Sequence, residues 1–331
     1  MKPSRESPPA LFSIAWPLFG ELLLGIAVGL AGLALAARAS TAAAGAFALA
    51  NNVQATFFLL LRIVSLGVSV AITQELGAGN RAMADATARA ALGASSWMGI
   101  ATAGVVALSA RPLLGLLSAP ADVLPLAAPY LRVLSLAIGL DALNASMAAV
   151  LRAHLRPRDV LVNILSMHAL HLALCVPLML GFGPVAGLGL PGYALAMLMS
   201  RVFGIGFLLF LWRRRLGLVP RLGDWWRIHA APLKPVLHIG LPGAGEGMAY
   251  RLSLMATLVV VARMGTDALA THAYTTQLML LTVLPGLAIG LATEILVGRA
   301  AGSGDLHLAD RLARVTNEMA KRAESRGSLL E

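Results

Sequence analysis

This chain of 331 residues is poor in two kinds of side chain: it has one cysteine, and charged residues make up only 13% of it. The lone cysteine, Cys175, excludes a disulfide framework and a cysteine-based metal site within one chain. Soluble domains carry roughly 25% charged residues. The low charged fraction, together with 58% hydrophobic residues, excludes an ordinary soluble protein and predicts a membrane protein.

Long apolar runs dominate the rest of the sequence. They are continuous and rich in Leu, Ala and Gly, whereas a β-barrel needs short alternating strands. Each run reaches or exceeds the roughly 20 residues that cross a bilayer as a helix. We therefore expect an all-α polytopic membrane protein with eight helices, at residues 11–36, 47–73, 90–110, 123–150, 160–181, 188–212, 236–262 and 269–298. The first run is too long for a signal-peptide core, so it is expected to remain as a helix.

The positions of the 26 Lys and Arg residues explain the net charge of +10. Nineteen fall in loops on the side that holds the N-terminus, and only Arg38, Arg111 and Arg263 fall on the opposite side. The positive-inside rule then predicts a multi-pass protein of the cytoplasmic (inner) membrane with both termini in the cytoplasm. Because topology explains the basic excess, no nucleic-acid partner is expected.

The sequence also contains an internal repeat. A shift of 225 positions aligns Pro17 and Glu21 with Pro242 and Glu246, and it aligns the loop at 77–80 with that at 302–305. Six helices separate the two copies, so equivalent helices point the same way. The repeat is therefore parallel, with a pseudo-twofold axis along the membrane normal.

This repeat predicts an incomplete second half. A second unit as long as the first would extend to about residue 450, so we expect a chain that is truncated after its eighth helix. Two alternatives to an active protein remain open. The chain is an inactive fragment, or it is a membrane subunit that needs a second polypeptide for the missing helices. The predicted division is a cytoplasmic N-terminus at 1–10, a six-helix N-lobe at 11–212, a basic inter-lobe loop at 213–235, the start of a C-lobe at 236–305 and a polar tail at 306–331.

Three features resemble the multidrug and toxic compound extrusion (MATE) transporters: Pro17 early in the first helix, the loop at 74–80 with its counterpart at 297–305, and the segment 240–246 that opens the seventh helix. The likeness extends from about residue 11 to 314. It implies two six-helix lobes that form a V around a central cavity. It also implies export of small organic compounds driven by inward flow of H⁺ or Na⁺, with no enzymatic activity and no cofactor besides that ion.

Glu21 and Glu246 are the leading candidates for ion coupling. Each lies about ten residues into its predicted helix, so at 1.5 Å per residue each is roughly 15 Å from the cytoplasmic end and near the midplane. Pro17 and Pro242, one turn earlier, cannot donate a hydrogen bond to the preceding turn and bend the helix. An intramembrane carboxyl is costly unless it is paired or lines water. The alternative is that these glutamates only bond neighbouring helices.

Asp141 is a third intramembrane carboxylate, about nine residues from the cytoplasmic end of the fourth helix. It requires a partner on another helix, because Arg132 lies on the opposite face of its own helix. A functional role and a structural ion pair both remain open. Arg62, Arg132, Arg201 and Arg251 lie within spans and outnumber the deep carboxylates, which keeps open a flippase for an anionic lipid-linked substrate.

Weaker signals complete the set of polar residues in the spans. Asn51, Asn52 and Gln54, near the outer end of the second helix, either line the cavity or bond across helices. His168 and His171 share one helix face without a third ligand, so no metal site is expected. Glu294 lies close to the end of the eighth run, from which its side chain is expected to reach the membrane interface.

Overall fold

The computed structural model describes residues 8–117, 119–182, 185–262, 264 and 266–327. Almost all of them are helical, as the long apolar runs predict. The helices and turns are α1 (Pro8–Ala39), α2 (Thr41–Gly77), α3 (Arg81–Leu108), α4 (Ala110–Leu116), α5 (Leu124–Ala153), α6 (Pro157–Leu180), α7 (Leu190–Leu211), the π turn η1 (Trp212–Leu216), the 3₁₀ turn η2 (Leu222–Trp225), α8 (Ala230–Ala262), α9 (Thr266–Gly302) and α10 (Leu306–Gly327). Two short strands, β1 (Gly181–Phe182) and β2 (Val185–Ala186), pair antiparallel after α6.

Each predicted run falls in one long helix: α1, α2, α3, α5, α6, α7, α8 or α9. In the described part of the chain, seven helices are long and apolar enough to cross a membrane, and α8 is not among them. α8 carries the charged residues Lys234, Glu246 and Arg251 within 33 residues. The all-α polytopic fold is confirmed, with the small β1–β2 hairpin as its one departure in the described residues.

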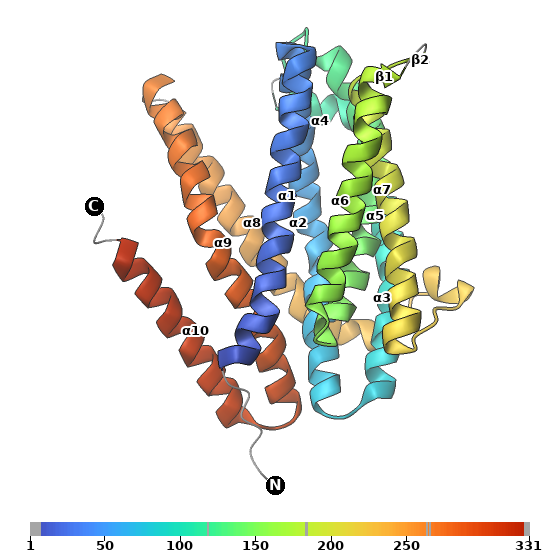
Figure 1. Ribbon diagram of the computed structural model, residues 1–331, viewed down its shortest axis with the longest axis vertical. Coiled ribbons are helices and arrows are strands. Elements are labelled where there is room, and N and C mark those ends of the chain that lie inside the picture. The colour runs from blue at the N-terminus through green and yellow to red at the C-terminus, as the bar shows by residue number, and fades with distance from the viewer. Residues whose placement is uncertain (1–7, 118, 183–184, 263, 265, 328–331) are drawn as a thin grey trace.

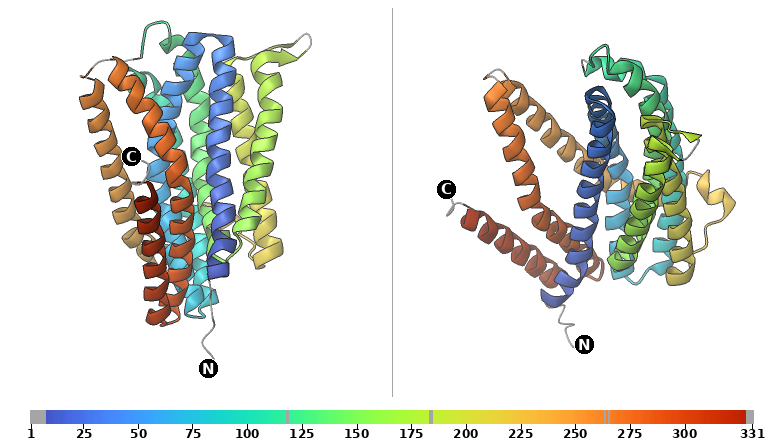
Figure 2. Two further views of the ribbon diagram at one scale, coloured as in Figure 1. Left: turned by 60° about the vertical axis from the view of Figure 1, so that its left-hand side comes forward. Right: turned by 45° about the horizontal axis from the view of Figure 1, so that its top comes forward.

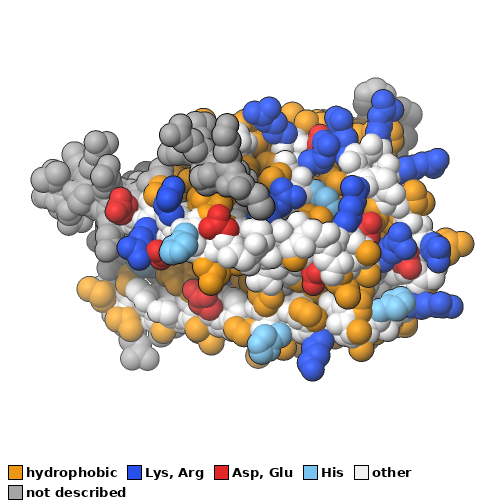
Figure 3. Space-filling model, turned by 90° about the horizontal axis from the view of Figure 1, so that it is seen from below, with side chains coloured by type: hydrophobic (Ala, Val, Ile, Leu, Met, Phe, Trp, Pro, Cys, Tyr) orange, Lys and Arg blue, Asp and Glu red, His pale blue; other side chains and the backbone are white. Residues whose placement is uncertain are grey.

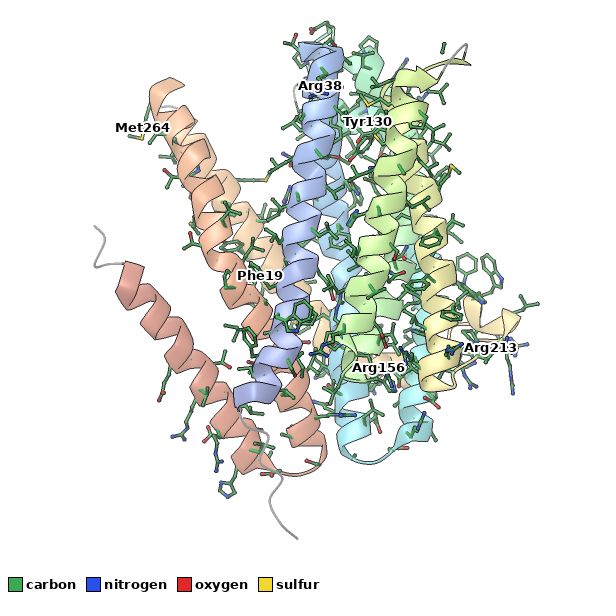
Figure 4. All side chains as sticks on the ribbon, in the orientation of Figure 1. Phe19, Arg38, Tyr130, Arg156, Arg213 and Met264 are labelled. Atoms are coloured by element: carbon green, nitrogen blue, oxygen red, sulfur yellow. The ribbon has the colours of Figure 1, made fainter. Side chains whose placement is uncertain are left out.

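The first six long helices stand side by side as one bundle, whereas α8 and α9 lean away from it as a pair (Figures 1 and 2). The connections α2–α3, α5–α6, α7–α8 and α9–α10 lie at the lower end of Figure 1, together with the start of α1. Figure 3 shows Lys and Arg side chains spread over this end. Arg156 and Arg213 are at this basic end in Figure 4, and Arg38 and Met264 are at the other.

α5 is the centre of the bundle. It lies against α2, α3 and α7, and most of its residues are buried. Gly99 of α3 and Gly139 of α5 permit this close approach, because a Cβ at Gly99 would be 2.3 Å from the carbonyl oxygen of Gly139. Aromatic rings fill the opposite side of α5, where Phe47, Tyr130 and Tyr193 are in mutual ring contact. Small residues at helix crossings are the usual basis of membrane helix packing.

The repeat is visible in the backbone of two turns. Gly79 and Gly304, 225 residues apart, have φ values of 77° and 78°, which a glycine adopts without strain. The next residue caps the following helix in both turns. Asn80 accepts a hydrogen bond from the amide of Met83, and Asp305 accepts one from the amide of Leu308.

The two copies also meet each other. A Cβ at Gly77 of α2 would be 2.1 Å from the carbonyl oxygen of Arg299, and one at Gly302 of α9 would be 2.0 Å from that of Gln74. These four residues form two pairs related by the 225-residue shift. The pseudo-twofold axis therefore passes between α2 and α9 near the basic end.

The segments outside the apolar runs are partly ordered. α8 begins at Ala230, earlier than the predicted 236, and the basic loop before it contains η1 and η2. The polar tail forms α10, which lies against α9. The hydroxyls of Thr293 and Thr316 are 2.6 Å apart, and Leu312 packs on the cluster that joins α1 and α9.

Candidate functional site

A cavity of about 290 Å³ lies among α1, α2, α5, α6 and α9. Its wall is mostly apolar, with Leu18, Phe58 and Ile295 among the lining side chains. Its polar lining residues come from all five helices and include three carboxylates: Glu21, Ser65, Ser69, Asp141, Asn144, Arg152, Asn163 and Glu294. Two of the carboxylates, Glu21 and Asp141, are predicted from the sequence as coupling residues.

Glu21 is paired with Arg152. Their side chains approach to 2.5 Å between Oε2 and Nη2, and the glutamate side chain is 7% exposed. Arg152 lies in the last turn of α5, so the pair links the interior of α1 to the basic end of α5. Pro17, one turn before Glu21, is buried. Burial of a carboxylate is tolerated because the guanidinium compensates its charge.

Asp141 is paired with Arg201 of α7, at 2.5 Å between Oδ1 and Nε, and both residues are 7% exposed. The requirement for a partner on another helix is thus met by an arginine that the sequence also singles out. The side-chain amide of Gln54 of α2 donates to the sulfur of Met197 in α7 at 3.8 Å. The side-chain amide of Asn144 donates to the backbone carbonyl of Arg201 at 3.2 Å, so α2, α5 and α7 are tied together here.

Three oxygen atoms among the cavity residues accept no hydrogen bond from the described part of the chain. They are Oε1 of Glu21, Oδ1 of Asn144 and Oδ1 of Asn163. Carboxylate and amide oxygens bind hard cations and water. Neither asparagine is among the residues predicted from the sequence. An amide in an apolar run was the available signal, and Asn144 lies three residues after Asp141, on the same helix face.

Glu246 does not share this environment. It is exposed on α8, it is not among the lining residues of the cavity, and it has no ion pair or hydrogen bond with the described residues. Pro242 is exposed as well. Arg152, the partner of the equivalent Glu21, comes from α5, and the described part of the chain has no helix in the equivalent position against α8.

The remaining polar candidates bond across helices. Asn52 accepts a hydrogen bond from Arg251 at 2.9 Å, which joins α2 to α8, and Asn51 accepts a longer one from Tyr130 at 3.4 Å. Arg62 is a residue of α2, and its side chain lies outside the described residues. Neither asparagine lines the cavity.

The structure also places Glu294 and the two histidines of α6. α9 extends to Gly302, so Glu294 lies two turns from its end, and it lines the cavity. His171 of α6 faces the aromatic side of the bundle. His171 is fully buried, with its ring 4.7 Å from that of Tyr193.

Comparison with known proteins places this geometry in a family. The family model described as MatE matches residues 17–177 and 242–317. The uncharacterized transporter YisQ of Bacillus subtilis is 28% identical over 91% of this chain and 66% of its own length. A probable multidrug resistance protein NorM of Deinococcus radiodurans is 30% identical over 92% of this chain and 67% of its own. A crystal structure of the Vibrio cholerae MATE transporter VcmN in the bent form has a TM-score of 0.84 at 21% identity and covers 97% of this chain and 72% of that one.

The chain spans about two thirds of the length of the curated relatives that it matches. The two matched ranges begin at Pro17 and Pro242, so they coincide with the two copies of the repeat. With seven candidate spans in the described residues, the protein is a multi-pass membrane protein. Its sequence and its fold together show that the chain belongs to the MatE family of multidrug and toxic compound extrusion proteins.

Proposed function

We propose that the protein is a secondary active transporter, not an enzyme, which couples inward movement of H⁺ or Na⁺ to efflux of small organic compounds. The family and the names of its relatives, among them the probable multidrug resistance protein of Deinococcus radiodurans, support transport as the activity. In this proposal the protein lies in the cytoplasmic membrane with both termini in the cytoplasm, and it needs no cofactor besides the coupling ion.

The observation that carries the proposal is the composition of the cavity. Among the described residues that line it, three are carboxylates and one is an arginine. The unpaired oxygens of Glu21, Asn144 and Asn163 supply acceptors for a cation and for the water around it. Oxygen acceptors in a partly enclosed cavity suit a bound cation better than an anion.

The same composition disfavours the flippase for an anionic lipid-linked substrate. The flippase alternative rests on the number of arginines in the predicted spans. Arg201 is neutralised by Asp141, Arg251 bonds to Asn52 on α2, and Arg132 is exposed. None of these three lines the cavity, so their charge does not make it basic.

The Glu21–Arg152 pair suggests how a cation could change the conformation. A cation bound at Glu21 competes with Arg152 for the same carboxylate. Arg152 is 25% exposed at the basic end, so its side chain has room to turn toward water when it is released. Release of Arg152 would break the ion pair between α1 and α5, while α1 stays packed on α9 of the second repeat. Such differential binding shifts the populations of two states.

Transport in proteoliposomes tests the proposal. Glu21→Gln keeps the size of the side chain and removes its charge, so coupled counterflow of a cationic dye should be lost with normal membrane insertion. Glu75→Gln, near the end of α2 and outside the cavity lining, is the matched control and should transport normally.

Asp141→Asn and Asp310→Asn form a second matched pair, since Asp310 is exposed on α10. Unchanged coupling in both cavity variants would reject the proposed site.

Glu246 with Pro242 remains a proposed second coupling position, because it is the repeat equivalent of Glu21 with Pro17. Glu246→Gln is measured in the same assay. If Glu21→Gln abolishes coupling and Glu246→Gln does not, ion coupling belongs to the first repeat alone.

A further inference from the structure

The segment between α7 and α8 is docked across the outer surface of α3. A Cβ at Gly93 of α3 would be 2.2 Å from the carbonyl oxygen of Arg227, so only glycine permits this approach. The indole nitrogen of Trp97 donates to the carbonyl of Trp226 at 2.9 Å, and the two rings are 6.3 Å apart at 76°. These contacts fix the turn η2 against the bundle at its basic end.

This turn separates two hollows of opposite character. On one side is a cavity of about 430 Å³ between α3, η2 and the start of α8, whose charged and titratable lining residues are Arg89, Arg221, Asp224, Arg227 and His229. On the other side is an apolar groove of about 570 Å³, lined by Leu222, Trp225 and Trp226 together with residues of α3, α5 and α7. We call these the basic cavity and the apolar groove.

Among the described residues that line the basic cavity, three arginines face one carboxylate, that of Asp224. None of the three arginines is within salt-bridge distance of a carboxylate in the described part of the chain. The Nε atom of Arg89 is buried and has no hydrogen-bond partner among the described residues. Asp224, the acidic lining residue, accepts from the backbone amide of Arg221. Unpaired guanidinium groups in a partly enclosed hollow favour an anion, and their geometry suits phosphate.

The two hollows have the spacing of a lipid. They lie along one stripe of α3, with Ala86 and Arg89 in the basic cavity, and Ser96, Ile100 and Ala103 in the apolar groove. From Arg89 to Ile100 the helix rises by about 16 Å, and one leaflet of the hydrocarbon core is about 15 Å deep. Tryptophans such as Trp225 and Trp226 are common at the boundary between these zones.

We propose that this face binds an anionic phospholipid from the leaflet on the basic side of the membrane. Its phosphate is held by Arg221, Arg227 and Arg89, and one acyl chain lies in the apolar groove, passing over the exposed Leu222. Basic pockets at the ends of membrane helices bind anionic head groups in this way. The site is separate from the carboxylate cavity, with no lining residue in common, so the lipid is a bound ligand and not the transported substrate.

Quenching of tryptophan fluorescence tests the site. The purified full chain is placed in phosphatidylcholine nanodiscs that contain increasing amounts of phosphatidylglycerol with brominated acyl chains. We expect saturable quenching at low mole fraction, and weaker, non-saturable quenching when the bromine is on phosphatidylcholine. Each lost charge should weaken binding about fivefold, so Arg221→Gln/Arg227→Gln should weaken it about 25-fold.

A matched variant separates this site from general surface charge. Arg213→Gln/Arg214→Gln removes the same charge from exposed arginines of the same connection that do not line the basic cavity. This control should stay within twofold of the parent. An equal loss in both double variants, with all proteins monodisperse, would overturn the proposal in favour of a diffuse basic surface.

A second variant separates the lipid from a free anion. Trp225→Ala removes part of the groove and should weaken phosphatidylglycerol binding while leaving the basic cavity intact. If Trp225→Ala has no effect and inorganic phosphate displaces the brominated lipid at millimolar concentration, the cavity binds a soluble anion and the lipid proposal is wrong.

Discussion

Two glutamates in the same local sequence have different surroundings in this protein. Glu21 and Glu246 both follow the pattern Pro-x-x-Gly-Glu, yet Glu21 is buried against Arg152 and Glu246 is exposed. The pattern and its place in an apolar run predict the helix, the bend at the proline and the depth of the carboxylate in the membrane. It carries no information on the partner, because Arg152 comes from a helix 131 residues farther along the chain.

The Glu21–Arg152 pair leads to a first prediction, on stability. Arg152→Gln should destabilise the protein by about 3–5 kcal/mol, because it leaves a buried carboxylate uncompensated. Arg156→Gln removes an arginine that is 39% exposed and should cost about 0–1 kcal/mol. Thermal unfolding in detergent compares the two. Equal losses would mean that the Glu21 pair is solvated.

His154, which follows α5 at the basic end, leads to a second prediction. Burial lowers the pKa of His154 below its ordinary 6.5, and its Nδ1 lies 2.8 Å from the carbonyl of Val150. The folded state thus holds the neutral ring, and the unfolded chain binds more protons as the pH falls through 6.5. Stability should therefore decrease from pH 7.5 to 5.5.

His154→Gln should remove part of that acid-induced loss. Melting temperatures of the parent and the variant at both pH values check it. A parent whose melting temperature does not change between these pH values, or a variant with the same decrease, would contradict the assignment to His154.

Among the elements, the long helices follow most directly from the sequence. Continuous apolar runs predict α1, α2, α3, α5, α6, α7, α8 and α9 because a bilayer imposes both length and helical hydrogen bonding. The turn η2 and its contact with α3 leave no such signal, since they depend on Gly93 meeting a backbone far along the chain. The cavity that contains Glu21 and Asp141 also leaves no signal in the sequence, because its amides and carboxylates lie on different helices.

The crossing of α2 and α9 gives an element-scale prediction. Gly302→Ala would bring a methyl group to 2.0 Å from the carbonyl of Gln74, so the helices must separate and the melting temperature should fall by several degrees. Gly290→Ala, in the same helix with nothing within 4 Å, should be neutral or stabilising by up to about 1 kcal/mol. A Gly302→Ala protein as stable as the parent would show that this contact is loose.

Over the whole molecule, the basic side chains define one end, and the orientation prediction follows from them. Because Cys175 is buried, single cysteines can be added at exposed positions. We expect Leu188→Cys, at the end away from the basic loops, to react with a membrane-impermeant maleimide in intact cells. Ser303→Cys, at the basic end, should react only after lysis. The reverse pattern would place the termini outside.

The glycine contact between α2 and α9 also has a mechanical consequence. Backbone touches backbone at Gly77 and Gly302, close to the basic end, whereas α2 continues for 37 residues toward the other end. Such a helix is about 55 Å long, so it acts as a lever with its fulcrum near one tip. One degree of rotation at the fulcrum moves the far tip by about 1 Å. Once the Asn52–Arg251 hydrogen bond between α2 and α8 opens, the largest displacements between the repeats therefore arise at the end opposite the basic loops.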